Sequence, residues 1–313
     1  MEVAWWRPQE TQMKLAMIGL GRMGGSMTER LLKAGHAVVA YAPDSAAVAE
    51  AEKRGAIGAH SVEEVVRKLE PPRVVWLMIP VGPPVEETIN ALRPLLARGD
   101  IIVDGGNSRF TDSVRRAGEL AAAGIGFVDA GTSGGVWGLK DGYCLMIGGE
   151  AEHVRKVEPV FKALAPLEGY AHVGRAGAGH YTKMIHNAIE YAMLQAYGEG
   201  FAMLEASDFD LDLPRIAALW THGAVVRSWL LDLLALALKD DPELASIEGY
   251  VEDSGMGRWT VHEAVELAVP VPALADALFA RFASRQQDSF SAKVTAALRN
   301  HFGGHAVRAT QPK

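Results

Sequence analysis

Short apolar runs alternate with amphipathic stretches along the first half of the chain, from Met13 to about Val173. The apolar runs, rich in Val, Ile and Leu, predict strands at residues 15–18, 37–41, 74–78, 101–104, 127–130 and 144–147. Helical periodicity appears between them, for example at residues 46–54, 62–69 and 113–123. Nearly continuous apolar strands that alternate with helices are typical of a parallel sheet covered on both faces.

The pattern changes after Gly177, where strand-like runs stop and only helical periodicity remains. It predicts helices at residues 179–206, 213–219, 225–238, 260–268, 272–285 and 292–300, punctuated by Pro242, Pro270 and Pro272. We therefore expect an α/β domain over residues 13–176 and an all-α domain over residues 177–313, joined by a long interdomain helix. Residues 1–12 lack the apolar core of a signal peptide, and we expect a disordered extension there.

Composition excludes several classes of protein. The net charge of −7 argues against a general nucleic-acid binder, which needs a basic face to neutralise phosphates. No apolar run approaches the roughly 18 residues of a membrane span. The one cysteine, Cys144, rules out a disulfide framework, and its apolar neighbours indicate a packing residue. A reducing compartment, the cytoplasm, is the expected location.

A glycine motif follows the first predicted strand: Gly19-Leu20-Gly21-Arg22-Met23-Gly24, before a helix predicted at residues 26–34. Gly19 allows a tight turn, Gly21 lets the backbone approach a pyrophosphate, and Gly24 allows close packing of helix and strand. The free amides at the helix N-terminus would meet the diphosphate. This context predicts a Rossmann-type doubly wound sheet that binds a dinucleotide, with Met23 near the nicotinamide.

The choice between NAD and NADP depends on the end of the second strand, where NAD enzymes place an acidic residue that binds the ribose hydroxyls. Here the segment is Tyr41-Ala42-Pro43-Asp44, with Asp44 near that place. No cation follows in this loop, and Arg22 is the one nearby. We therefore expect NAD, with NADP as the alternative.

Four further segments complete a pattern that resembles the 6-phosphogluconate dehydrogenase family. They are Asp104-Gly105-Gly106-Asn107-Ser108, then Ser133-Gly134-Gly135, then Lys183-Met184-Ile185-His186-Asn187 with Glu190-Tyr191, and last Arg299-Asn300-His301-Phe302-Gly303-Gly304-His305. The resemblance covers residues 13 to about 307, and the chain looks like a short form that lacks the second half of the helical domain. It implies oxidation and decarboxylation of 6-phospho-D-gluconate to D-ribulose 5-phosphate, in the pentose phosphate pathway and gluconate utilisation.

Lys183, Asn187 and Glu190 stand at i, i+4 and i+7 of the long predicted helix and so share one face. Lys183 and Glu190 are separated by roughly 10 Å along the axis, so both can reach one small substrate. The resemblance makes Lys183 the general base, makes Glu190 the acid that protonates the enediol, and requires no metal. A lysine acts as a base only when neutral, which burial favours. On spacing alone, both could be ordinary surface charges.

The same resemblance implies further contacts. Ser133, Gly134 and Gly135 would bind the substrate's carboxylate region, and Asn107 would lie between substrate and nicotinamide, although a simple turn cap is its alternative. His186 and Asn187 would bind the substrate hydroxyls. The substrate phosphate would be bound by Tyr191, Arg281, Arg299 and His305. Ser254 stands where longer relatives have a lysine. The tail of relatives reaches a neighbouring subunit, so we expect a homodimer or homotetramer.

Two other functions fit parts of this pattern. A β-hydroxyacid dehydrogenase of the 3-hydroxyisobutyrate or tartronate-semialdehyde type shares the glycine, Ser-Gly-Gly and Lys–Asn features. It lacks the segment at residues 104–107, the pair Glu190-Tyr191 and the Arg299-to-His305 tail. A non-catalytic nucleotide sensor would have no use for both Lys183 and Glu190.

Overall fold

The computed structural model describes residues 12–309 and divides into two compact units between His186 and Asn187. This division falls inside the long helix α8 (Ala178–Glu205), which contributes residues to both units. Except for Gln12, the N-terminal extension expected at residues 1–12 lies outside the described residues.

The first unit is built on an eight-stranded sheet of order β3-β2-β1-β4-β5-β6-β7-β8. The strands are β1 (Lys14–Ile18), β2 (Ala37–Tyr41), β3 (Ile57–Gly58), β4 (Val74–Leu77), β5 (Ile101–Asp104), β6 (Gly126–Ser133), β7 (Cys144–Gly149) and β8 (Tyr170–Gly174). The six strands from β3 to β6 in this order are parallel, as a Rossmann-type sheet requires. The predicted fold class is thus confirmed.

The expectation of a wholly parallel sheet is wrong at one edge, because β7 runs antiparallel to β6. The connection between them holds only the short helices η1 (Gly135–Trp137) and α6 (Gly138–Asp141), which cannot return the chain across the sheet. Cys144 opens β7 and is exposed, so its interpretation as a packing residue is also wrong. The prediction missed β3, which has two residues, and β8, which is largely exposed and has no apolar run.

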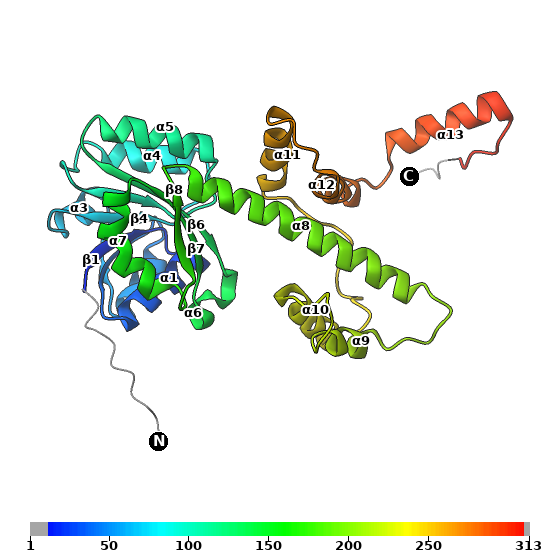
Figure 1. Cartoon of the computed structure of the whole chain (residues 1–313), viewed down its shortest axis with the longest axis horizontal. Helices are drawn as coiled ribbons and strands as arrows, with labels where there is room; N and C mark the ends of the chain where they lie inside the picture. Colours follow the sequence, from blue (N-terminus) through cyan, green and yellow to red (C-terminus); the bar gives the residue numbers. More distant parts are fainter. Residues whose placement is uncertain (1–11, 310–313) are drawn as a thin grey trace, which may run out of the picture. The chain divides into compact units, whose positions relative to one another are not determined.

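Helices cover both faces of the sheet. Figure 1 shows α4 (Pro83–Leu92) and α5 (Phe110–Ala121) on one side, together with α3 (Val62–Arg67). The other side carries α1 (Arg22–Lys33) and α7 (Ala151–Leu164). The remaining helix, α2 (Ser45–Lys53), follows β2. Each face therefore buries its own apolar cluster against its own helices.

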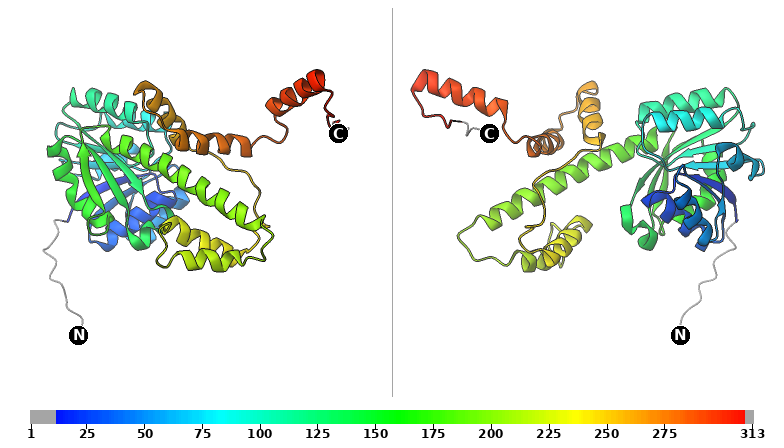
Figure 2. Two further views of the ribbon diagram at one scale, coloured as in Figure 1. Left: turned by 45° about the vertical axis from the view of Figure 1, so that its right-hand side comes forward. Right: turned by 180° about the vertical axis from the view of Figure 1, so that it is seen from behind.

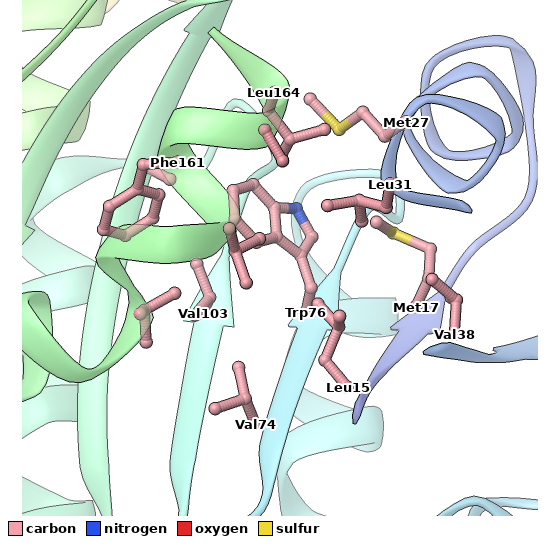
Figure 3. Close-up of a cluster of buried hydrophobic side chains, with 14 of the residues drawn as sticks. Leu15, Met17, Met27, Leu31, Val38, Val74, Trp76, Val103, Phe161 and Leu164 are labelled. Carbon is pink, nitrogen blue, oxygen red and sulfur yellow. The ribbon is translucent and has the colours of Figure 1, made fainter. Parts of the chain in front are cut away.

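Trp76 of β4 lies at the centre of one cluster (Figure 3). Its indole is fully buried between Met27 and Leu31 of α1 and Phe161 and Leu164 of α7. An aromatic side chain of this size accounts for a large share of the buried apolar area. This packing joins α1 and α7 to β4 and to β1, the strand whose end carries the glycine motif.

The second unit is helical, as predicted. After α8 come α9 (Leu213–Trp220), α10 (Trp229–Asp240), α11 (Met256–Glu266), α12 (Pro272–Ser284) and α13 (Phe290–Gly303). Helices α9 and α10 lie side by side in both views of Figure 2 and share an apolar cluster with Phe201 of α8. The helix predicted from residue 225 begins instead at Trp229, because Ser228 caps it by accepting from the Leu231 N–H at 3.2 Å.

The apolar positions of α8 are only partly buried. Met184 is buried, but Ile189 and Met193 are 49% and 37% exposed. No helix within residues 12–309 combines the length and apolar character that crossing a membrane requires.

Candidate active site

The glycine motif occupies the turn from β1 into α1. Gly19 adopts φ +98°, and a Cβ there would lie 2.3 Å from the Met78 carbonyl oxygen. A Cβ on Gly24 would lie 1.9 Å from the Gly19 carbonyl oxygen, so only glycine fits either position. Gly21 is the N-cap of α1, without a side-chain cap, and a Cβ there would meet nothing within 4 Å. The α1 amides therefore face open space of the kind that a dinucleotide phosphate fills.

A hollow of about 400 Å³ adjoins this turn, lined by Leu20, Gly21 and Arg22 among others. Met23, half-buried, packs against the apolar cluster that contains Trp76. Arg54 also lines the hollow, and its guanidinium is paired with Glu29 at 2.8 Å and Glu50 at 3.0 Å. The cations beside the glycine turn are thus one exposed arginine, Arg22, and one that is already paired.

Asp44 lies three residues beyond the end of β2 and is exposed. Its Oδ1 accepts the Ala46 N–H at 2.9 Å and caps α2. Capping explains an aspartate at this place, and one carboxylate oxygen remains outside that bond.

Asn107 is exposed, and a buried network anchors the residues on both sides of it. Asp104, at the end of β5, accepts the Gly106 N–H at 3.1 Å and the Ser108 hydroxyl at 2.7 Å. Arg116 of α5 donates to the same carboxylate at 3.0 Å. The loop therefore presents Asn107 at the edge of the sheet where parallel strands end and ligands bind.

Three of the predicted residues meet beside the end of β6. The Ser133 hydroxyl lies 3.4 Å from His186 Nε2, and His186 Nδ1 lies 3.5 Å from Lys183 Nζ. Lys183 is 5% exposed. The adjoining Gly134 and Gly135 have φ values of +133° and +52° and form the turn into η1. A buried amine beside an imidazole and a hydroxyl can hold and move a proton at a hydroxyl-bearing substrate.

The start of α8 lies directly against the sheet backbone. A Cβ on Gly131 would be 2.6 Å from the Lys183 Cβ, and one on Gly179 would be 2.4 Å from the Met146 carbonyl oxygen. Asp129, fully buried in β6, accepts the Gly177 N–H at 2.7 Å and the His180 N–H at 2.8 Å. Glycine contacts and a buried cap together hold the helix that carries Lys183.

Asn187 and Glu190 follow Lys183 on α8, at the i+4 and i+7 positions that the sequence predicted. Asn187 is 8% exposed, and Glu190 is half-buried. A continuous helix through all three confirms that they share one face.

The second unit brings together Tyr191, Ser254 and Arg281. The Tyr191 hydroxyl lies 3.0 Å from the Ser254 Oγ and also accepts the Ser254 N–H at 3.0 Å. The Arg281 guanidinium stacks on the Tyr191 ring, 3.6 Å from its centroid, and donates one bond to the Glu252 carbonyl at 2.9 Å. A stacked arginine beside two hydroxyls suits a phosphate.

The neighbouring Asp253 orients this loop. It accepts hydrogen bonds from Arg258 at 2.9 Å and from Arg285 at 3.1 Å. The bonds from Arg258, although burial opposes them, lower the pKa of Asp253 to about 2. Arg258 and Arg285 are therefore compensated, whereas Arg281 contacts a ring and a carbonyl.

Arg299 and His305 are not brought to this cluster by a contact within the described chain. Arg299 belongs to α13, none of whose residues is buried, and His305 lies just beyond, exposed. Within residues 12–309, no group of three or more His, Cys, Asp or Glu side chains could hold a metal.

The sequence did not predict the roles of Asp129 and Arg116. Asp129 holds the start of α8 in place, and Arg116 holds the loop that carries Asn107. The available signal was a charged residue within a buried element: Asp129 interrupts the apolar strand at residues 127–130, and Arg116 is 1% exposed. Buried charges need dedicated partners, so such positions indicate a network.

Comparison with known proteins agrees with this geometry. Residues 14–174 match the family model described as the NAD binding domain of 6-phosphogluconate dehydrogenase, and residues 179–310 match that of its C-terminal domain. The chain is 45% identical to a putative 6-phosphogluconate dehydrogenase of Bacillus subtilis, over 94% of this chain and 99% of the relative. It is 46% identical to an NAD(+)-dependent, decarboxylating 6-phosphogluconate dehydrogenase of Haloferax volcanii, over 94% of this chain and 98% of the relative.

Among solved structures, the fold is similar to the 6-phosphogluconate dehydrogenase of Plasmodium falciparum, with a TM-score of 0.81 and 27% identity. That similarity covers 96% of this chain but 67% of the Plasmodium chain. The near-complete match to two relatives and the partial match to a longer one are what a short form requires.

Proposed function

The chain belongs to the 6-phosphogluconate dehydrogenase family, and we propose that it oxidises and decarboxylates 6-phosphogluconate with NAD in the pentose phosphate pathway. In this proposal residues 13–176 bind the cofactor, and residues 177–313 bind substrate and a second subunit. The observation that carries the choice of substrate is the cluster of Tyr191, Ser254 and Arg281, because an unphosphorylated hydroxyacid has no use for it.

Lys183 acts first, by taking the proton from the carbon-3 hydroxyl of the substrate. NAD, held at the turn formed by Gly19, Gly21 and Gly24, would supply the acceptor for the hydride that leaves carbon 3. The carbon-3 ketone lies β to the carboxylate, so the bond between carbons 1 and 2 breaks, carbon dioxide leaves, and an enediol remains. Glu190 then protonates the former carbon 2, which becomes carbon 1 of the product, to give ribulose 5-phosphate.

The remaining groups bind and orient the substrate. After the oxidation, protonated Lys183 polarises the new carbonyl. His186, between Lys183 and Ser133, orients the amine and binds a substrate hydroxyl, as does Asn187. Ser133 and the amides of Gly134 and Gly135 hold the carboxylate region.

NAD is the proposed cofactor because the turn after β2 offers a carboxylate and no free cation. Asp44 would bond the ribose hydroxyls and repel a 2′-phosphate. Arg54 is already paired with Glu29 and Glu50, which leaves Arg22 as the nearby unpaired cation. The Haloferax volcanii relative is named as NAD(+)-dependent, in agreement with this assignment.

We expect the assembly to be at least a homodimer. The fourteen residues of α13 include exposed Phe290, Leu298 and Phe302, spaced by four or eight residues on one face. An isolated helix of this length is marginal in water, so packing must stabilise it. A second copy of the chain would cover this face and receive Arg299 and His305 at its substrate phosphate.

The test of the function is cofactor reduction with 6-phosphogluconate, run in parallel with NAD and NADP and in the presence of a chelator. We expect stoichiometric carbon dioxide and ribulose 5-phosphate, a preference for NAD, and little activity on gluconate. Turnover of 3-hydroxyisobutyrate with none of 6-phosphogluconate would instead favour a β-hydroxyacid dehydrogenase. Binding of NAD without reduction of any substrate would favour a sensor.

Sharing of the tail can be tested by subunit exchange between a Lys183→Met protein and an Arg299→Ala protein. If the tails cross over, some mixed dimers hold one site with both residues intact, and activity reappears. No recovery after demonstrated exchange would show that Arg299 serves its own subunit or no site.

A further inference from the structure

We propose that Arg116, a buried residue of α5, is a positioning residue that aims Asn107 at the reacting atoms. This inference rests on the proposed function, in which Asn107 lies between substrate and nicotinamide.

The contacts of Arg116 extend in two directions. Its Nη1 donates to Asp104 Oδ2 at 3.0 Å and to the Ser108 Oγ at 3.1 Å. Its Nε and Nη2 donate to Glu86 Oε1 of α4 at 2.9 and 2.8 Å. One guanidinium thus connects two helices to the loop that follows β5.

Each end of this network is held separately. Burial acts to raise the pKa of Glu86, but hydrogen bonds from Arg116 and Arg115 outweigh it and keep the pKa below its ordinary value. Asp104, Ser108 and Arg116 are each 1% exposed. A buried guanidinium with carboxylates on two sides has one favourable placement, because any movement leaves a buried charge unpaired.

The loop itself leaves Asn107 little backbone freedom. The Gly105 N–H donates to the Leu77 carbonyl at 2.9 Å, and a Cβ on Gly105 would lie 2.2 Å from Trp76 Nε1. Ser108, on the other side, is held by Asp104 and Arg116. Asn107 is the exposed residue between two anchored neighbours, and Arg116 holds the anchor on its C-terminal side.

A matched control lies at the opposite end of the same strand. Arg73 donates its backbone N–H and its Nη1 to Asp100, fully buried just before β5, at 2.7 and 3.0 Å. Both pairs join an arginine to a buried aspartate beside β5, but Asp100 lies at the edge away from the strand ends that bind ligands. Arg73→Met therefore reproduces the loss of a buried pair without reaching Asn107.

The experiment compares Arg116→Met with Arg73→Met. Both should lower the melting temperature. Arg116→Met should also lower kcat with 6-phosphogluconate by about 10–100-fold, since a displacement on the order of 1 Å can cost 10²-fold, with NAD affinity nearly unchanged. Arg73→Met should keep the wild-type kcat at a temperature where it is folded. Equal kcat losses in the two variants would overturn the proposal.

A double-mutant cycle with Asn107→Ala separates positioning from general destabilisation. If Arg116 acts through Asn107, Arg116→Met should lower kcat little further in the Asn107→Ala background, whereas independent effects would multiply. If Arg116→Met does not fold, Ser108→Ala replaces it in the cycle, because it removes one anchor and leaves the ion pairs. Multiplying effects would overturn the inference, while an inactive wild type would overturn the proposed function itself.

Discussion

Replacing Asp129 with asparagine tests whether the hydrogen bonds that hold the start of α8 against the sheet control catalysis. The carboxylate accepts two backbone N–H groups, from Gly177 and His180, one on each oxygen. An amide keeps one acceptor and turns its NH₂ group toward a donor, so one charge-assisted bond is lost. That loss costs about 1.5–3 kcal/mol of the free energy of unfolding, and it leaves one buried backbone N–H facing the NH₂ group of the asparagine. At about 2–4 °C per kcal/mol, the melting temperature should fall by roughly 3–12 °C.

The effect on rate should exceed the effect of reduced stability. Lys183 follows His180 by one turn, so a shift of the helix start moves its amine relative to Ser133. Such misplacement should reduce kcat by about 10–100-fold, with NAD affinity nearly unchanged, as measured by steady-state kinetics and cofactor titration.

The control is Asp212→Ala, which removes an aspartate cap from α9, where Asp212 accepts the Arg215 N–H at 2.9 Å. It should cost about 1 kcal/mol of stability and leave kcat unchanged. If Asp129→Asn loses stability but keeps the wild-type kcat, Asp129 does not control the position of the Lys183 amine.

Three further predictions concern the base, the cofactor and the phosphate loop. Lys183→Met should reduce turnover by at least about 10²–10⁴-fold while NAD titration stays near the wild-type curve; near-normal turnover would remove Lys183 from the mechanism. Asp44→Ser should narrow the NAD preference in kcat/KM and preserve the α2 cap, because serine caps helices as well as aspartate does, and a wild type that prefers NADP would contradict the role of Asp44. The hydrogen bonds from Arg258 lower the pKa of Asp253 from 3.8 to about 2, so its stabilising effect is present above pH 3.8 and lost as the pH falls toward 2. Asp253→Asn should therefore lower the melting temperature more at pH 7 than near pH 2, and an equal loss at both would show that its charge is not what stabilises the loop.

The sequence predicted features that depend on local pattern. Strands such as Ala37–Tyr41 and Ile101–Asp104 have the predicted bounds, because continuous apolar runs ended by turn residues leave little choice. The Lys183-to-Glu190 face followed from helical spacing alone. Features that depend on contacts between distant segments were missed. The antiparallel β7, the exposed Cys144 and the Arg54–Glu29 pair arise from tertiary packing, which no local periodicity records.

The residues that organise the site were also missed, and their arrangement explains why. Asp104 and Asp129 are partners in register on neighbouring strands β5 and β6, and both are buried. Two carboxylates so placed repel each other unless each has its own donors. Arg116 and the Asn107 loop supply them for Asp104, and the start of α8 supplies them for Asp129.

Helix α5 connects the two carboxylate networks. Arg116 reaches Asp104, and Ser113, one turn earlier on α5, lies 2.7 Å from His180 Nδ1 at the start of α8. One helix face therefore holds both the loop that carries Asn107 and the helix that carries Lys183. Because one helix holds both segments, Asn107 and Lys183 can move little relative to each other. General acid–base chemistry requires such a fixed geometry. Each contact joins segments far apart in the sequence, so a single chain reveals them only after it has folded.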